Sequence, residues 1–262
     1  MAYRSASVID NVIWRAPLQP QRPSLAEAVR ATIAQTREHL LDFIRLDEPA
    51  PQSAMTLAQW CRPNELQSLL AVYSDHIYRN QPTQPRENKP LLSLWAQWYI
   101  GLMVPPLMLA LLTQETAIDV SPEHVHVEFH ETGRAACFWI DVHPDRQATE
   151  CSPQMRIEIL IKQALTPVVQ ALEATGEING KLIWSNTGYL IHWYLNEMKP
   201  LLGEELLHAL RHACFFEKQL SCGTDNPLWR TVVPREGVLV RRTCCQRYRL
   251  PDVQQCGDCT LK

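Results

Sequence analysis

The most regular feature of the chain is a series of stretches in which apolar residues recur at helical spacing. The first, residues 24–46, opens with Ser24 as an N-cap and Glu27 three positions later, followed by apolar residues every three or four positions. We expect one long amphipathic helix there. Residue Gly203 is a natural stop signal between two later helices. The same helical spacing predicts one or two helices over 57–78. It also predicts one helix over each of 153–175, 185–202 and 204–216.

Residues 91–112 form an uncharged stretch that is long enough to span a bilayer. Two observations favour a buried location instead. Pro105 and Pro106 interrupt helical hydrogen bonding in its second half, and Ser93 and Gln97 are polar. We therefore expect two buried helical pieces with a break between them, and at most peripheral contact with a membrane.

One short stretch alternates between apolar and polar residues, as a β-strand does, and a later stretch is rich in β-forming residues. Over 125–129 the apolar residues Val125, Val127 and Phe129 lie on one face. His124, His126, Glu128 and His130 lie on the other. A turn at 131–134 then leads to a second strand over 135–142. A further hairpin is expected from 229–233 and 238–240. The fold class is therefore α+β, a mainly helical body with two small β-hairpins. We expect two parts, the body over 1–225 and a C-terminal segment over 226–262.

The charge distribution separates these two parts. The formal net charge is −3, but from Arg230 onward there are seven basic and three acidic residues, against 18 basic and 25 acidic residues in 1–229. Five of the nine cysteines are scattered, so a disulfide framework is not expected. Residues 1–10 lack the pattern of a secretory signal, and the expected location is the cytoplasm.

The remaining four cysteines lie close together near the C-terminus, as Cys244, Cys245, Cys256 and Cys259, in the pattern Cys-Cys-x10-Cys-x2-Cys. Four thiolates form a complete ligand set for zinc or for a [2Fe-2S] cluster. Adjacent side chains on a strand point to opposite faces, which makes convergence on one zinc ion awkward and favours the larger cluster. Spacing alone leaves both metals open. A zinc-stabilised module for nucleic-acid or protein interaction remains the alternative function.

Arginines surround this pattern, at positions 241, 242, 247 and 249. They indicate either stabilisation of a negatively charged metal centre or a docking site for an acidic electron donor. The acidic body argues against a nucleic-acid partner. We also expect Phe215, Phe216 and Trp229 to form a hydrophobic seat for the cysteine segment.

With these cysteines the chain resembles the FhuF-type siderophore-iron reductases, whose signature is the same four-cysteine pattern at the extreme C-terminus. The resemblance extends over essentially the full length, including Ser93-Leu-Trp-Ala-Gln-Trp-Tyr-Ile-Gly-Leu-Met, Gly180-Lys-Leu-Ile-Trp-Ser-Asn-Thr-Gly-Tyr-Leu and Asn226-Pro-Leu-Trp-Arg. It implies one [2Fe-2S] cluster per chain on Cys244, Cys245, Cys256 and Cys259. It also implies an oxidoreductase, in the cytoplasm or loosely at the inner face of the inner membrane, that reduces ferric iron in hydroxamate siderophores such as ferrichrome, coprogen and ferrioxamine B.

Such a reaction requires one electron and no nucleophile or general base, which agrees with the absence of hydrolase and P-loop motifs. The nine glycines include no G-x-G, so a dinucleotide site is not expected. Electrons are therefore expected from a separate donor, such as a ferredoxin or a flavin reductase. No catalytic residues are expected beyond the cluster ligands.

Two further groups of residues have both a functional and an ordinary interpretation. The histidines of 124–130 could form an iron site, but a polar outer strand face explains them equally and is preferred. His208 and His212 receive the same interpretation. Residues Trp184, Tyr189, Trp193 and Tyr194 could line a siderophore pocket, although helical spacing makes a core position the preferred interpretation.

Overall fold

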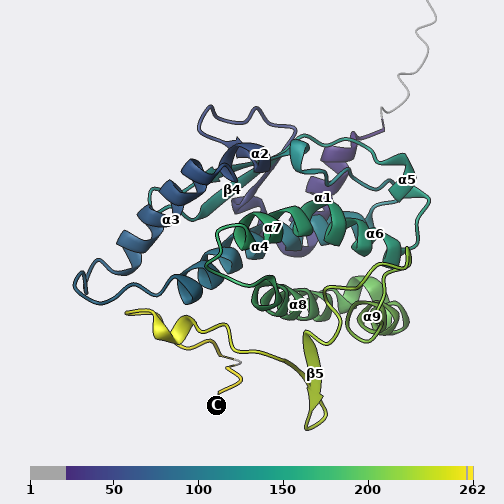
Figure 1. The fold of residues 1–262 in the computed structure, drawn as a ribbon. Coiled ribbons are helices and arrows are strands. Elements are labelled where there is room, and N and C mark those ends of the chain that lie inside the picture. Colours follow the sequence, from purple (N-terminus) through teal and green to yellow (C-terminus); the bar gives the residue numbers. More distant parts are fainter. Residues whose placement is uncertain (1–21, 258, 262) are drawn as a thin grey trace, which may run out of the picture.

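A computed structural model describes residues 22–257 and 259–261 of the protein (Figure 1). The sequence features at residues 1–10 and the charges of Asp258 and Lys262 lie outside the described residues. Helices surround a central helix, a small sheet lies at one end, and the C-terminal segment passes along the outside of the bundle. The predicted α+β class, mainly helical with two small sheets, is confirmed.

Helix α4 (Asn88–Thr113) forms the centre of the core and packs against α1, α3, α6, α8 and strand β4. It is continuous, so the expected break at Pro105 and Pro106 is wrong. Each proline removes a helical hydrogen bond, at a cost of about 3 kcal/mol. Leu107, Leu109 and other neighbouring side chains are completely buried, and burial of each contributes roughly 1.5–3 kcal/mol. Packing therefore outweighs the local penalty.

The same helix is the only described one long and apolar enough to cross a membrane. Of its most apolar 18-residue window, 67% is buried inside the protein. This agrees with the prediction that residues 91–112 are buried in the protein core and do not face lipid.

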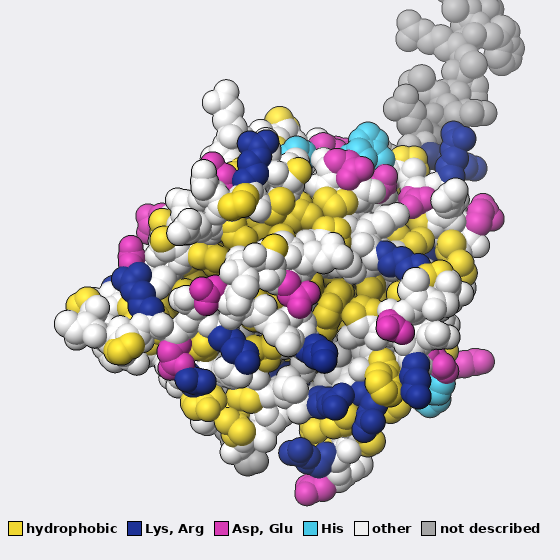
Figure 2. All heavy atoms as spheres, in the orientation of Figure 1, with side chains coloured by type: hydrophobic (Ala, Val, Ile, Leu, Met, Phe, Trp, Pro, Cys, Tyr) yellow, Lys and Arg dark blue, Asp and Glu magenta, His cyan; other side chains and the backbone are white. Residues whose placement is uncertain are grey.

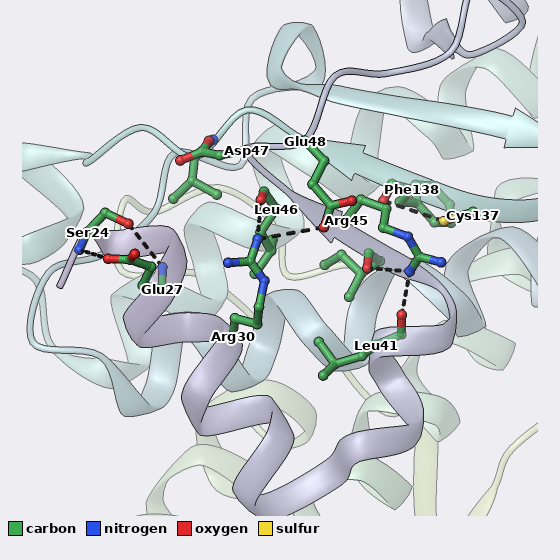
Figure 3. A network of polar contacts seen from close by, with 12 residues as sticks. Ser24, Glu27, Arg30, Leu41, Arg45, Leu46, Asp47, Glu48, Cys137 and Phe138 are labelled. Atoms are coloured by element: carbon green, nitrogen blue, oxygen red, sulfur yellow. Dashed lines mark hydrogen bonds and ion pairs between the residues drawn. The ribbon is translucent and has the colours of Figure 1, made fainter.

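The N-terminal helix is shorter than predicted. Helix α1 (Leu25–Arg37) has the expected capping box, in which Ser24 and Glu27 bond to each other's backbone amides (Figure 3). It gives way to a 3₁₀ turn (Glu38–Asp42) and then to strand β1 (Ile44–Leu46). Arg30 donates to the Leu46 carbonyl and so ties the helix to the strand. A three-residue strand is too short for its alternation to be distinguished from helical spacing, and the prediction of one helix over 24–46 is therefore wrong.

The predicted first hairpin is present and forms the centre of a four-stranded sheet in the order β1-β4-β3-β2. Strands β3 (Val125–Phe129) and β4 (Ala135–Ile140) are antiparallel, β2 (Met55–Thr56) pairs with β3, and β1 pairs in parallel with β4. Gly133 in the hairpin turn has φ 79°, and its carbonyl accepts a hydrogen bond from Trp95 Nε1 of α4 at 2.8 Å. The sheet is thus fixed to the central helix.

The helices predicted over 57–78 and 153–175 match the structure closely, but the boundary expected at Gly203 is displaced, because α8 ends at Glu197 and α9 begins at Lys199. In α9, Gly203 has φ 76° and breaks the regular backbone at the predicted stop signal. A π-helical turn (Leu160–Leu165) joins α6 to α7, just before Pro167, which has no backbone amide to donate. The bounds are α2 Leu57–Trp60, α3 Pro63–Ile77, α5 Arg146–Thr149, α6 Pro153–Ile159, α7 Thr166–Glu173, α8 Gly180–Glu197 and α9 Lys199–Phe215, with 3₁₀ turns at Pro122–His124 and Arg247–Arg249.

The second predicted hairpin is formed by β5 (Val232–Arg235) and β6 (Val238–Arg241). Its two turn residues, Glu236 and Gly237, have φ values of 51° and 82°, as a tight hairpin of this kind requires. The hairpin packs on α8 and leads directly into the cysteine segment. The division of the chain at residue 226 stays a prediction.

Candidate functional site

The cysteine segment, defined here as residues 242–261, lies along α4 and α8 and is fixed to them by polar side chains (Figure 1). Ser93 Oγ of α4 donates to the backbone carbonyl of Cys245 at 2.8 Å, and Asn186 Nδ2 of α8 donates to Ser93 Oγ at 2.9 Å. Thr243 Oγ1 donates to Ser185 Oγ at 2.7 Å. These hydrogen bonds attach the cysteine pair to the buried core.

The expected aromatic seat for this segment is not found. Phe216 and Trp229 are 42% and 36% exposed, and Phe215 is part of the core beneath α9. The hydrogen bonds that hold the cysteine pair come from α4 and α8 instead. Sequence reasoning favoured large apolar residues because an anchor is most often hydrophobic, whereas this one is a short network of hydroxyl and amide groups.

The four thiols lie next to one another in a chain of contacts. Cys245 Sγ and Cys256 Sγ are 3.9 Å apart, and Cys244 and Cys256 are both close enough to Cys259 to lower the pKa of its thiol. Gln246, which directly follows the pair, has φ 63°, and its amide donates to Cys244 Sγ at 3.3 Å. Strand β6 ends at Arg241, so the cysteine pair lies outside the strand conformation on which the geometric objection rests.

The protonation of these thiols depends on burial and on their neighbours. Burial raises the pKa of Cys244 and of Cys256, and the nearby Cys245 sulfur adds to both effects. The pKa of Cys259 is lowered, chiefly because the Leu261 amide donates to its sulfur. Metal ligands must be deprotonated, so binding a metal here would release protons.

Arg241 is the charged residue most closely associated with the thiols. It is 4% exposed, its Nη2 donates to Cys256 Sγ at 3.0 Å, and its guanidinium lies 5.4 Å from the centre of the Tyr189 ring. Burial alone would lower the pKa of Arg241, but the surrounding cysteine sulfurs outweigh burial and raise it. A fixed positive charge therefore faces the sulfurs from the last residue of β6.

This donor set fits a [2Fe-2S] cluster. Four sulfurs are adjacent, one buried cation offsets negative charge, and backbone amides of Gln246 and Leu261 already donate to sulfur. Over the described residues, no group of three or more His, Cys, Asp or Glu side chains is found that could hold a metal ion in the arrangement shown.

A hollow of about 300 Å³ opens beside the thiols. Cys256 and Arg241 form its inner wall, and Ile100 of α4 and Tyr189 and Trp193 of α8 line the remainder. Trp193 is 49% exposed, so its preferred interpretation as a core residue is wrong. Tyr194 is buried as expected, and Trp184 lies on another face of α8.

The histidines singled out in the sequence take the ordinary interpretation. His126 Nε2 lies 3.3 Å from Asp141, His124 Nε2 lies 3.6 Å from Asp119, and His130 hydrogen-bonds to Thr132 in its own turn. His212 pairs with Glu217 at 3.1 Å. Each histidine has a separate local partner, which agrees with the preferred polar surface rather than an iron site.

Comparison with known proteins assigns the family. The model of the family described as ferric iron reductase FhuF-like transporter matches residues 93–239, and the model of the FhuF 2Fe-2S C-terminal domain matches residues 241–261. The chain therefore belongs to the FhuF-type family of iron–sulfur reductases. It is an oxidoreductase, and its cofactor is a [2Fe-2S] cluster, so the zinc alternative is set aside.

Over its whole length the chain is 79% identical to the ferric siderophore reductase of Escherichia coli (strain K12), and the alignment covers 100% of both chains. The two family matches meet at β6, where Arg241 begins the C-terminal one. The likeness includes both the cysteine segment and the body that carries it.

Sequence reasoning missed the residues that connect the cysteines to the body. Ser93 and Asn186 are distant in sequence from the cysteines, and each is unremarkable where it stands. Arg241 was predicted, with its neighbouring arginines, to stabilise the metal centre or to dock a donor, but its contact with Asn186 was not. A polar residue such as Ser93 inside an otherwise apolar helix was the available signal. It was used only as an argument against a membrane span.

Proposed function

We propose that the protein reduces ferric iron held by hydroxamate siderophores such as ferrichrome, coprogen and ferrioxamine B, with its cluster on Cys244, Cys245, Cys256 and Cys259. The observation that carries the proposal is that Cys256 lines an open, largely apolar hollow next to Tyr189 and Trp193. A ferric chelate seated there would lie directly beside a cluster ligand.

The chemistry needs electron transfer and little else. Iron(III) is a hard ion that hydroxamate oxygens hold tightly, whereas iron(II) prefers softer ligands, so one added electron favours release. When bound, the cluster supplies a one-electron carrier. The residues of the chain bind and orient the chelate and keep Arg241 beside the sulfurs.

The hollow has room for one edge of a siderophore and not for the whole molecule. Its aromatic wall suits the apolar backbone of the chelate, and Gln97 and Asn186 offer polar groups. Thr187 and Arg241 are two of the residues that line the hollow. Their atoms Oγ1 and Nε, respectively, are buried without a hydrogen-bond partner among the described residues. Such orphaned polar atoms support the binding of a polar ligand.

We also propose that iron(II) is released in the cytoplasm, with at most peripheral association at the inner membrane. All nine cysteines lie within the described residues and none of them forms a disulfide there, as a reducing compartment favours. The burial of α4 within the protein supports the same location.

The test is a single turnover under anaerobic conditions. The dithionite-reduced protein is mixed with ferric ferrichrome, coprogen or ferrioxamine B, and iron(II) is trapped with ferrozine. With the chelate concentration varied, we expect Trp193→Ala to raise the concentration that gives half the maximal single-turnover rate about tenfold, because one aromatic contact contributes roughly 1.4 kcal/mol. Trp98→Ala is the control, since Trp98 is 39% exposed but lies against Arg134 away from this hollow. Equal effects of both changes, or no iron(II) from any of the three chelates, would contradict the proposal.

A further inference from the structure

A second, larger hollow reaches the cysteine segment from another face of α8. Its volume is about 630 Å³, and its lining includes Lys181, Trp184, Lys218, Trp229, Arg230 and Arg242. On α8 it is lined by residues 181, 184 and 185, whereas the hollow beside Cys256 is lined by residues 183, 186, 187, 189, 190 and 193. At 3.6 residues per turn these two sets point to different sides of the helix.

This second hollow is strongly cationic. Its four basic side chains are exposed and are accompanied by one acidic residue, Asp225. Among the ion pairs between described residues, none includes Lys181, Lys218, Arg230 or Arg242. Their positive charge is therefore not neutralised locally, although residues 1–229 as a whole are acidic. Figure 2 shows Lys and Arg side chains gathered at the lower right of this face, over the region of β5 and α9.

Aromatic side chains lie between these cations. The Lys218 ammonium and the Arg230 guanidinium lie 5.5 and 5.6 Å from the centre of the Trp229 ring, which is 36% exposed. An exposed aromatic ring bordered by cations is typical of a protein-binding surface, where Trp and Arg are the side chains that most often carry the affinity. The hollow thus offers apolar contact area together with charge.

The wall of this hollow is continuous with the cluster site. Thr243, which lines it, directly precedes Cys244 and bonds to Ser185 at 2.7 Å. The Arg242 amide donates to the Thr231 carbonyl at 2.9 Å. A partner seated here would lie next to the first cysteine pair, while the hollow proposed for the chelate lies next to Cys256.

We propose that this cationic hollow is the docking site of an acidic one-electron carrier protein. The proposal rests on the proposed function, since a ferric reductase needs a source of single electrons. The carrier is oxidised by one electron, and the siderophore-bound iron(III) is reduced by that electron to iron(II), so the transfer itself forms no covalent bond. A nicotinamide would deliver a hydride and two electrons, and the acidic body repels an extended polyanion such as a nucleic acid.

The test measures binding of the holoprotein to a small acidic [2Fe-2S] ferredoxin by calorimetry, without siderophore, at several salt concentrations. We expect saturable binding that weakens steeply with salt. Lys218→Glu and Arg230→Glu should each raise the Kd about tenfold or more, with a smaller dependence on salt. Circular dichroism and the visible spectrum of the cluster confirm that each variant is folded and loaded.

Arg146→Glu on α5 is the matched control, because it makes the same change in net charge on an exposed residue outside the hollow. Equal weakening by all three variants would overturn the proposal, since it would reflect net charge alone. The proposal would also be overturned if the protein bound free FMN but not ferredoxin, and if Lys218→Glu abolished that FMN binding. Reduction of ferrichrome by the dithionite-reduced protein tests the proposed function separately, because it needs no carrier.

Discussion

His192 is a buried titratable residue of α8 that lies outside the cysteine segment. It is 7% exposed, its Nε2 lies 3.3 Å from Asn196 Nδ2, and its ring packs edge-on against Phe215 with 5.9 Å between ring centres. Burial, with a smaller contribution from Arg211, lowers the pKa of His192 to about 4. The folded protein therefore holds this imidazole in its neutral form at neutral pH.

This has a consequence for stability in acid. In the unfolded chain His192 takes up a proton near pH 6.5, but in the folded protein only near pH 4. The free energy of unfolding is therefore unaffected by this histidine above about pH 6.5. As the pH falls from there toward 4, uptake of a proton by the unfolded chain lowers that free energy by at most about 3 kcal/mol. Urea denaturation of the wild type and of His192→Gln, measured at intervals from pH 7 to pH 4, checks this. The two stabilities should diverge across that range, and parallel curves would exclude the assignment.

At the scale of elements, the contact between α8 and the chain before β5 is so close that it admits only glycine. A Cβ atom at Gly188 would lie 2.0 Å from Thr231 Oγ1 and 2.6 Å from Thr231 Cβ. Thr231 is itself held by a hydrogen bond from its hydroxyl to the Leu228 carbonyl at 2.7 Å. Gly188 thus sets the distance between α8 and the segment that leads into the cysteines.

We expect Gly188→Ala to destabilise the protein by about 1–3 kcal/mol, because overpacking outweighs the gain in helix propensity. Gly101→Ala in α4 is the matched control. A Cβ atom added at Gly101 would have no described atom outside its own helix turn within 4 Å, so this change should stabilise by about 0.5–1 kcal/mol. Denaturant midpoints of the two variants should move in opposite directions. A rise of both midpoints would contradict the prediction, because it would show that Thr231 moves aside to accommodate the added Cβ atom.

The sequence predicted elements where one local signal was dominant. Strand β3 alternates over five residues and a turn leads from it to the apolar strand β4, so this hairpin was predicted correctly. Gly203 breaks the regular backbone as predicted, although it does so inside α9 and not at the end of α8. Strand β1 was missed because three residues carry too little pattern. The continuity of α4 was missed because local rules assign Pro105 a break, and only the surrounding core shows that packing overrides it.

At the scale of the whole molecule, the cluster ligands and the core are separate. The apolar core is built around α4, and the cysteine segment contributes Leu250 to it, with Val253 packed against it. The cysteine pair itself is held by hydrogen bonds to side chains of α4 and α8. Loss of the cluster should therefore leave the helical body folded.

We expect Cys245→Ser and Cys256→Ser to abolish the visible absorption of the cluster and the bound iron, while far-UV circular dichroism stays close to that of the wild type. Cys222→Ser is the control, because Cys222 is exposed and contacts Lys162 away from the segment. It should keep both iron and colour. Global loss of helical signal in the first two variants would refute the separation.

The cysteine pattern could be recognised in the sequence because its four members lie within sixteen consecutive residues. The hollows could not, because each combines side chains from α8 with distant segments such as 96–100 or 218–231. Charge counts located the basic C-terminal end, but Lys181 and Lys218 of the cationic hollow precede it. Only the folded chain brings them together.

The arrangement of two hollows on different faces of one helix bears on how long an electron must stay in the protein. A helix with its side chains is about 10–12 Å across, so a carrier on one face and a chelate on the other can be seated at the same moment. Arrival and departure of the electron can then follow each other closely. Dioxygen, which would compete for that electron, has little time to intercept it.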